Sequence, residues 1–173
     1  TERDQLQAVV DELNPNLRRQ YALQFSLLKW ETGTYPSFGI DAQDVINNQI
    51  SNDYDAFIGV FWHRIGTPTA RAVSGSAEEF ERAFQKWKEN QSLIAPALYF
   101  KTENPPFKEI NPDQLRGVQE FKKKSHEMGG YTREFSSSPE FEKLIRQHIL
   151  KLAADLADTL NISAAEIIAG PPS

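Results

Sequence analysis

The sequence predicts an α/β domain in which helices cover both faces of a mostly parallel sheet. Segments with strand-like patterns alternate with helix-like segments along the 173-residue chain. Residues 56–62 are a continuous apolar run of β-favouring residues, which is typical of a central parallel strand buried on both faces. Alternating strands and helices of these lengths imply right-handed crossovers within one sheet. We expect residues 1–168 to form one domain and residues 169–173, which are rich in proline, to begin a linker.

The first half of the chain opens with a helix. Apolar residues at helical spacing predict it over residues 2–13, and Asn14-Pro15-Asn16 is expected to end it. Residues 22–30 alternate and then become apolar, as a strand does, before a loop that contains glycine and proline. Asp41 can cap a helix that runs to Ile50.

After the strand at residues 56–62, small and polar residues predict a loop over residues 63–75. A helix is expected to start near Ser76, with an apolar stripe made of Phe80, Ala83, Phe84 and Trp87. Residues 94–100 read as the next strand, although Pro96 removes one hydrogen-bond donor.

Three further elements complete the pattern. Asn111-Pro112 begins a helix that Gly129-Gly130 ends after Met128, residues 131–135 form a short strand, and a long last helix begins at Ser138. The element order therefore starts with a helix. Because this class of fold normally starts with a strand that occupies a central position, we expect the first strand to be missing from this chain.

Composition excludes several classes of function. The chain has no cysteine, which rules out disulfides, thiolate zinc sites and a cysteine nucleophile. Its formal charge of −5 argues against a non-specific nucleic-acid binder. Its three histidines have no metal-ligand spacing, so no metal site is expected. No apolar run is long enough to cross a bilayer, and we expect a cytoplasmic domain without a membrane partner.

The richest candidate site is the loop that follows residues 56–62, because ligands bind at the carboxyl ends of the strands in such sheets. The loop offers glycines, hydroxyls, guanidinium groups and the N-terminus of a helix, which together suit a phosphate or a ribose. The residues concerned are Arg64, Gly66, Ser74, Gly75 and Ser76, preceded by Trp62 and followed by Glu79.

Structural explanations of the same residues remain open. Ser76 followed by Glu79 is also the pattern of a capping box, in which Glu79 would contact only its own helix. Arg64 suits a salt bridge at a strand end, and Trp62 suits the core.

Other charged residues are expected to be solvated. The solvated face of the helix after the loop is predicted to consist of Glu78, Glu81 and Glu89, with Glu78 placed to pair with Arg82. Lys122-Lys123-Lys124 reads as the exposed side of another helix.

Several well-known catalytic motifs are absent. The chain has no GxxxxGK[ST] segment, no GxGxxG turn between a strand and a helix, and no GxSxG elbow. The chain therefore lacks the central motif of P-loop nucleotide hydrolases, of dinucleotide oxidoreductases and of α/β-hydrolases. Among the residue types that remain, a carboxylate is the best candidate for chemistry.

The sequence blocks on either side of the candidate loop resemble a known family. Residues 53–69 read Asp-Tyr-Asp-Ala-Phe-Ile-Gly-Val-Phe-Trp-His-Arg-Ile-Gly-Thr-Pro-Thr, and residues 74–81 read Ser-Gly-Ser-Ala-Glu-Glu-Phe-Glu. Together with residues 1–4 and 41–50, they resemble a bacterial family of TIR-like domains of unknown function. Such domains lie at the N-terminus of signalling and defence proteins, ahead of NACHT or other STAND-type ATPases and repeat modules.

The resemblance implies a flavodoxin-like, three-layer fold, in which this chain lacks the family's first strand and its Ser-Ser-Pro-type loop. It also implies an activity, since the wider TIR and nucleoside-deoxyribosyltransferase-like group uses a glutamate on the helix after a central strand for NAD cleavage or N-glycosidic transfer. By position that glutamate is Glu79. Trp62 or Trp30, with Glu31 beside the latter, would flank the base. NAD would then be a substrate, and no cofactor is expected.

A second function is compatible with the same resemblance. Many TIR domains only bind one another, so the chain could be a non-catalytic module for self-association in signal transduction. In either case we expect fused ATPase or repeat domains and homotypic contacts as partners. The hypothesis of NAD cleavage needs a Glu79 carboxylate that is available to a ligand. The hypothesis of a non-catalytic interaction module is compatible with Glu79 as part of a helix cap.

Overall fold

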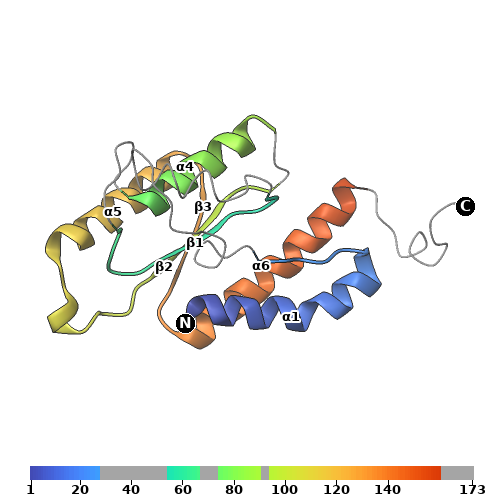
Figure 1. Cartoon of the computed structure of the whole chain (residues 1–173), viewed down its shortest axis with the longest axis horizontal. Coiled ribbons are helices and arrows are strands. Elements are labelled where there is room, and N and C mark those ends of the chain that lie inside the picture. The colour runs from blue at the N-terminus through green and yellow to red at the C-terminus, as the bar shows by residue number, and fades with distance from the viewer. Residues whose placement is uncertain (28–53, 67–73, 91–93, 161–173) are drawn as a thin grey trace, which may run out of the picture. The chain divides into compact units, whose positions relative to one another are not determined.

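A computed structural model describes residues 1–27, 54–66, 74–90 and 94–160 (Figure 1). The chain divides into two compact units, one made of residues 1–27 and 137–173 and the other of residues 28–136. The second unit contains the sheet and the candidate loop. The first unit contains the N-terminal and the C-terminal helix.

The sheet of the second unit confirms the α/β class with parallel strands. Its described strands are β1 (Ile58–Phe61), β2 (Ala97–Lys101) and β3 (Tyr131–Phe135), in the spatial order β1-β2-β3. Both pairings are parallel. Of the described strands, β2 has a neighbour on each side, and its first four residues are buried. The predicted strands at residues 56–62, 94–100 and 131–135 are therefore confirmed, the first two with shifted ends.

Two helices cover one face of this sheet, α4 (Gly75–Lys88) and α5 (Pro112–Glu127). Phe100 lies opposite Phe61 in the register, and Leu98 lies two residues before it, so these three side chains share a face. They pack against Phe80, Phe84, Val118 and Phe121 from the two helices. Helix α4 is the next described element after β1, and this packing holds it against the sheet.

Helix α5 has the predicted cap and the predicted end. The Asn111 Oδ1 atom accepts hydrogen bonds from the backbone N–H groups of Asp113 and Gln114, at 3.0 and 3.1 Å. The chain leaves the helix through Gly129, whose φ of +84° lies in the left-handed region that glycine adopts without strain. Before α5, the short 3₁₀ helix η1 (Phe107–Glu109) was not predicted.

The first unit contains α1 (Glu2–Tyr21) and α6 (Ser138–Thr159), which pack against each other. The Arg146 guanidinium donates to both carboxylate oxygens of Glu12, at 2.7 and 2.9 Å, and to Glu142 at 3.1 Å. The hydrogen bond from Arg146 lowers the pKa of the Glu12 carboxyl. The predicted last helix is confirmed, with Ser137 as its cap.

The predicted end of the first helix at Asn14-Pro15-Asn16 is wrong, because α1 continues through Pro15 to Tyr21. Proline lacks an N–H group and crowds the preceding turn, which normally breaks a helix. Here Leu17 extends the buried stripe of Val9, Val10 and Leu13 and is only 1% exposed. The packing of this extra turn offsets the defect, and the helix ends at Ala22, which has a φ of 52°.

The predicted strand at residues 22–30 is not present in its described part, residues 22–27. The side chain of Asn14, which is buried, binds both backbone groups of Phe25. Its Nδ2 atom donates to the Phe25 carbonyl at 2.9 Å, and its Oδ1 atom accepts from the Phe25 N–H at 2.9 Å. The Asn14 side chain therefore satisfies the backbone groups of Phe25 that a neighbouring strand would otherwise bind. Residues 28–30, the predicted helix at residues 41–50 and the predicted linker at residues 169–173 lie outside the described residues.

None of the helices in the described ranges combines the length with the apolar composition that crossing a membrane requires.

Candidate functional site

The two ends of the predicted ligand loop lie close together at the carboxyl end of β1. Residues 62–66 and 74–76 are described, and residues 67–73 are outside the described part of the chain. Gly66 has a φ of +105°, and a Cβ atom on it would lie 3.4 Å from the Ser74 Cβ. Glycine suits this position, since a side chain at this φ is strained. Gly66, which follows the end of β1 at Phe61, and Ser74 at the start of α4 are therefore neighbours.

Helix α4 is capped by Ser74. The Ser74 Oγ atom accepts a hydrogen bond from the Ala77 N–H at 3.1 Å, and the residue is 1% exposed. The capping box formed by Ser76 and Glu79 is therefore wrong, since Glu79 lies five residues beyond the true cap. A capping carboxylate must stand three residues after the cap to reach its N–H. Both serines suit a cap by residue type, so the sequence pattern alone does not distinguish them.

This assignment gives a first prediction. Ser74→Ala should lower the free energy of unfolding by about 1 kcal/mol, because it removes the acceptor of the Ala77 N–H. The exposed Ser76 is the matched control, and Ser76→Ala should change stability by less than about 0.5 kcal/mol. Urea unfolding of both variants measures the difference, and equal losses would contradict the assigned cap.

The two adjacent glutamates of α4 differ in environment. Glu79 is half-buried and lies near Tyr54. The pKa of the Tyr54 phenol is raised, mainly by burial; the charge of Arg82 lowers it, and the charge of Glu79 raises it further. Glu78 was predicted to be solvated, which is wrong, because it is only 8% exposed. Its predicted pairing with Arg82 is confirmed at 3.5 Å. Helix α4 therefore carries two carboxylates and a guanidinium that are partly or fully buried.

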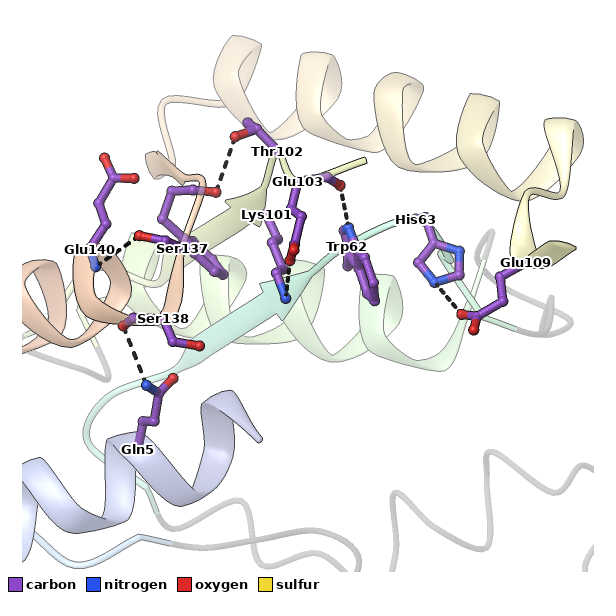
Figure 2. A network of polar contacts seen from close by, with 11 residues as sticks. Gln5, Trp62, His63, Lys101, Thr102, Glu103, Glu109, Ser137, Ser138 and Glu140 are labelled. Carbon is purple, nitrogen blue, oxygen red and sulfur yellow. Dashed lines mark hydrogen bonds and ion pairs between the residues drawn. The ribbon is translucent and has the colours of Figure 1, made fainter. Parts of the chain in front are cut away.

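Trp62 takes part in a polar network at the carboxyl ends of β1 and β2 (Figure 2). Its indole Nε1 donates to the Glu103 carbonyl at 2.7 Å, and the Lys101 ammonium lies 4.4 Å from its ring centre. Lys101 also pairs with the Glu103 carboxylate at 2.8 Å. A base that stacks on the face of Trp62 facing Lys101 would have to displace the ammonium group.

His63 is a site residue that sequence reasoning did not select. It is 8% exposed, meets the Trp62 ring edge-on at 4.4 Å, and places its Nε2 atom 3.7 Å from the Glu109 carboxylate (Figure 2). Its Nδ1 atom is buried and has no hydrogen-bond partner among the residues that the structure describes. The position of this polar residue just after the predicted buried strand is the sequence feature that could have identified it. The spacing of the histidines, which bears only on metal binding, does not identify it.

Gln114 is a second residue that sequence reasoning missed. Its Oε1 atom accepts from the backbone N–H groups of Ile65 and Gly66, both at 3.0 Å, and its Nε2 atom donates to the Gly66 carbonyl at 3.2 Å. It lies near the start of α5, 48 positions beyond Gly66. Its three hydrogen bonds hold the chain where it leaves β1.

The remaining predicted residues are distributed as follows. Arg64 and Ser76 are exposed, and Gly75 is the first residue of α4. Trp30 and Glu31 lie outside the described residues. Within the described ranges, no group of three or more histidine and acidic side chains is placed to hold a metal ion.

The lysine run of α5 is neutralised by carboxylates. Lys122 pairs with Glu134, Lys123 lies 3.9 Å from Glu127, and Lys124 pairs with Glu81 of α4. Each of the three ammonium groups therefore has an acidic neighbour. This arrangement agrees with the interpretation of the run as the outer side of a helix and gives no support to a phosphate-binding surface.

Comparison with known proteins adds no assignment. The chain matches no protein-family model, no curated protein and no solved structure. Its parallel α/β fold and the geometry at the carboxyl end of β1 are therefore the basis for a functional conclusion.

Proposed function

We propose that this chain is a TIR-like domain of the flavodoxin-like class that cleaves the N-glycosidic bond of NAD or a related nucleotide. The parallel sheet supports the fold. The position of Glu79 on the helix that follows β1 supports the activity. In this proposal the domain is a cytoplasmic effector in bacterial defence and acts with a fused STAND-type ATPase or with repeat modules.

The observation that carries the proposal is the cap of α4. Because Ser74 satisfies the Ala77 N–H, the structural explanation of Glu79 as part of a capping box no longer holds. Glu79 is then a half-buried carboxylate in the second turn of a helix near the carboxyl end of a parallel strand, which is where such sheets commonly bind ligands. Stabilisation of a developing positive charge is one that a carboxylate performs well.

The chemistry expected of this arrangement is simple. The bond between the ribose C1′ and the nicotinamide nitrogen breaks, and its electron pair leaves with nicotinamide. Glu79 stabilises the resulting oxocarbenium ion or attacks it, and water finally supplies the oxygen at C1′. The N–H groups of Gly75 and Ser76 lie in the first turn of α4 and have no acceptor within the helix, so they suit a phosphate.

Glu79→Gln tests this proposal. The variant keeps the shape of the side chain but removes its charge, and nicotinamide release from NAD should fall by ~100-fold or more. Glu81→Gln is the matched control on the same helix, because its partner is Lys124 and not the proposed ligand. The assay uses the chain at high concentration, so that any self-association can occur. Wild-type turnover in Glu79→Gln would refute the catalytic role.

A second candidate function rests on a different observation. Three large apolar side chains on or near η1 and the start of α5 are exposed: Phe107 at 89%, Ile110 at 43% and Leu115 at 37%. A contiguous patch of exposed apolar groups is typical of an interaction surface, and these three residues belong to one short stretch of the chain. They favour the non-catalytic alternative, a module that self-associates in signalling. Sedimentation analysis of Phe107→Asp tests it, since an oligomer that uses this surface should dissociate.

A further inference from the structure

We propose that Gln114 is a positioning residue for the proposed nucleotide-binding site, because its amide clamps the backbone of residues 65–66, shortly after the end of β1. The identity of the ligand rests on the proposed function. The clamp itself rests on the geometry of α5, Ile65 and Gly66.

The three hydrogen bonds of Gln114 use both ends of its amide. Its oxygen faces two backbone N–H groups, and its nitrogen faces one backbone carbonyl. A residue without both an acceptor and a donor at this position leaves at least one of these backbone groups without its partner. Three such hydrogen bonds on two adjacent residues strongly favour one backbone conformation.

A second residue of α5 serves the same segment. Gly117 lies three positions after Gln114 and therefore on the same side of the helix. A Cβ atom on Gly117 would lie 2.8 Å from the Cγ2 atom of Ile65, so glycine is needed for this close approach. Ile65 is buried in the core shared by β1, α4 and α5. One face of α5 thus holds the backbone of residues 65–66 and accommodates the Ile65 side chain.

The clamp acts on the proposed ligand groups through Gly66. This glycine is bound by Gln114, and a Cβ atom on it would lie 3.4 Å from the Cβ of Ser74, the cap of α4. Gln114 therefore sets where the backbone of Gly66 lies relative to the first turn of α4, which carries Gly75 and Ser76. A site held in place before the ligand arrives binds more tightly, because less conformational freedom is lost on binding.

Gln114→Met tests the clamp, since methionine has a similar length but cannot make these hydrogen bonds. Gln119→Met is the matched control, because Gln119 is an exposed glutamine on the same helix. Amide hydrogen exchange, measured by NMR without ligand, should become about tenfold faster or more at Ile65 and Gly66 in Gln114→Met and stay unchanged in Gln119→Met. In the same variant the KM for NAD should rise several-fold with kcat nearly unchanged, because binding geometry is lost while Glu79 is intact.

Gln114→Glu provides a graded check. Its carboxylate can still accept from both N–H groups but cannot donate to the Gly66 carbonyl, so exchange at Ile65 and Gly66 should lie between wild type and Gln114→Met. Unchanged exchange at both amides in Gln114→Met would overturn the clamp, and faster exchange with an unchanged KM would overturn its positioning role. If the wild-type chain does not cleave NAD, the proposed function fails, whereas faster exchange confined to these amides still supports the clamp.

Discussion

Replacing Phe80 with alanine is expected to lower the free energy of unfolding of the sheet-containing unit by about 3–5 kcal/mol. Phe80 has no exposed surface and lies between the rings of Phe57, Phe84 and Phe121, at centroid distances of 6.3, 5.9 and 5.6 Å. Alanine would remove the ring that joins α4 to α5 and leave a cavity. Backbone relaxation could fill it only in part, so the loss should lie near the upper end for core substitutions.

Phe107→Ala is the matched control for this substitution. It removes the same ring, but Phe107 is 89% exposed, so stability should change by less than about 0.5 kcal/mol. Urea unfolding followed by tryptophan fluorescence reports on this unit, because Trp62 and Trp87 lie within it. A loss below about 1 kcal/mol in Phe80→Ala would show that this aromatic cluster is not the core that holds α4 in place.

The sequence predicted those parts of the fold whose signals are local. The start and the end of α5 were found because the Asn111 cap and Gly129 act within a few residues, and the strand Tyr131–Phe135 follows directly after this glycine pair. The predicted start of α4 was shifted, because both Ser74 and Ser76 suit a cap by residue type and only the structure shows that the Ala77 N–H binds Ser74. The end of α1 was missed because the packing of Leu17 outweighs the effect of Pro15.

The same distinction applies to the candidate site. The loop after β1 was found from its position at a strand end and from its composition. Gln114 and Glu109 were not found, because they reach this loop from the segments that follow β2, more than 40 positions along the chain. These residues meet because the carboxyl ends of neighbouring parallel strands lie at one edge of the sheet. No periodicity within a single segment contains this information.

Asn14→Asp is expected to lower the free energy of unfolding by about 2–4 kcal/mol at neutral pH. The new side chain has almost the same shape and can still accept from the Phe25 N–H. It cannot donate to the Phe25 carbonyl, however, and it places a negative charge beside that oxygen in a buried position. Asn16→Asp is the control two residues later on α1. Asn16 is exposed and only accepts from Arg19, so its change should be within about 0.5 kcal/mol.

The dependence on pH separates loss of the donor from a general weakening of α1. When protonated, the introduced carboxyl can donate to the Phe25 carbonyl, so the folded state favours the protonated form and raises the pKa of this carboxyl above its usual ~3.9. The folded state then binds more protons than the unfolded state, and stability falls as pH rises through this range. Relative to wild type, the defect should therefore be smallest below ~pH 4 and reach its full size at neutral pH. A defect that is equal at both pH values would mean that the Asn14 amide does not hold Phe25 through its donor.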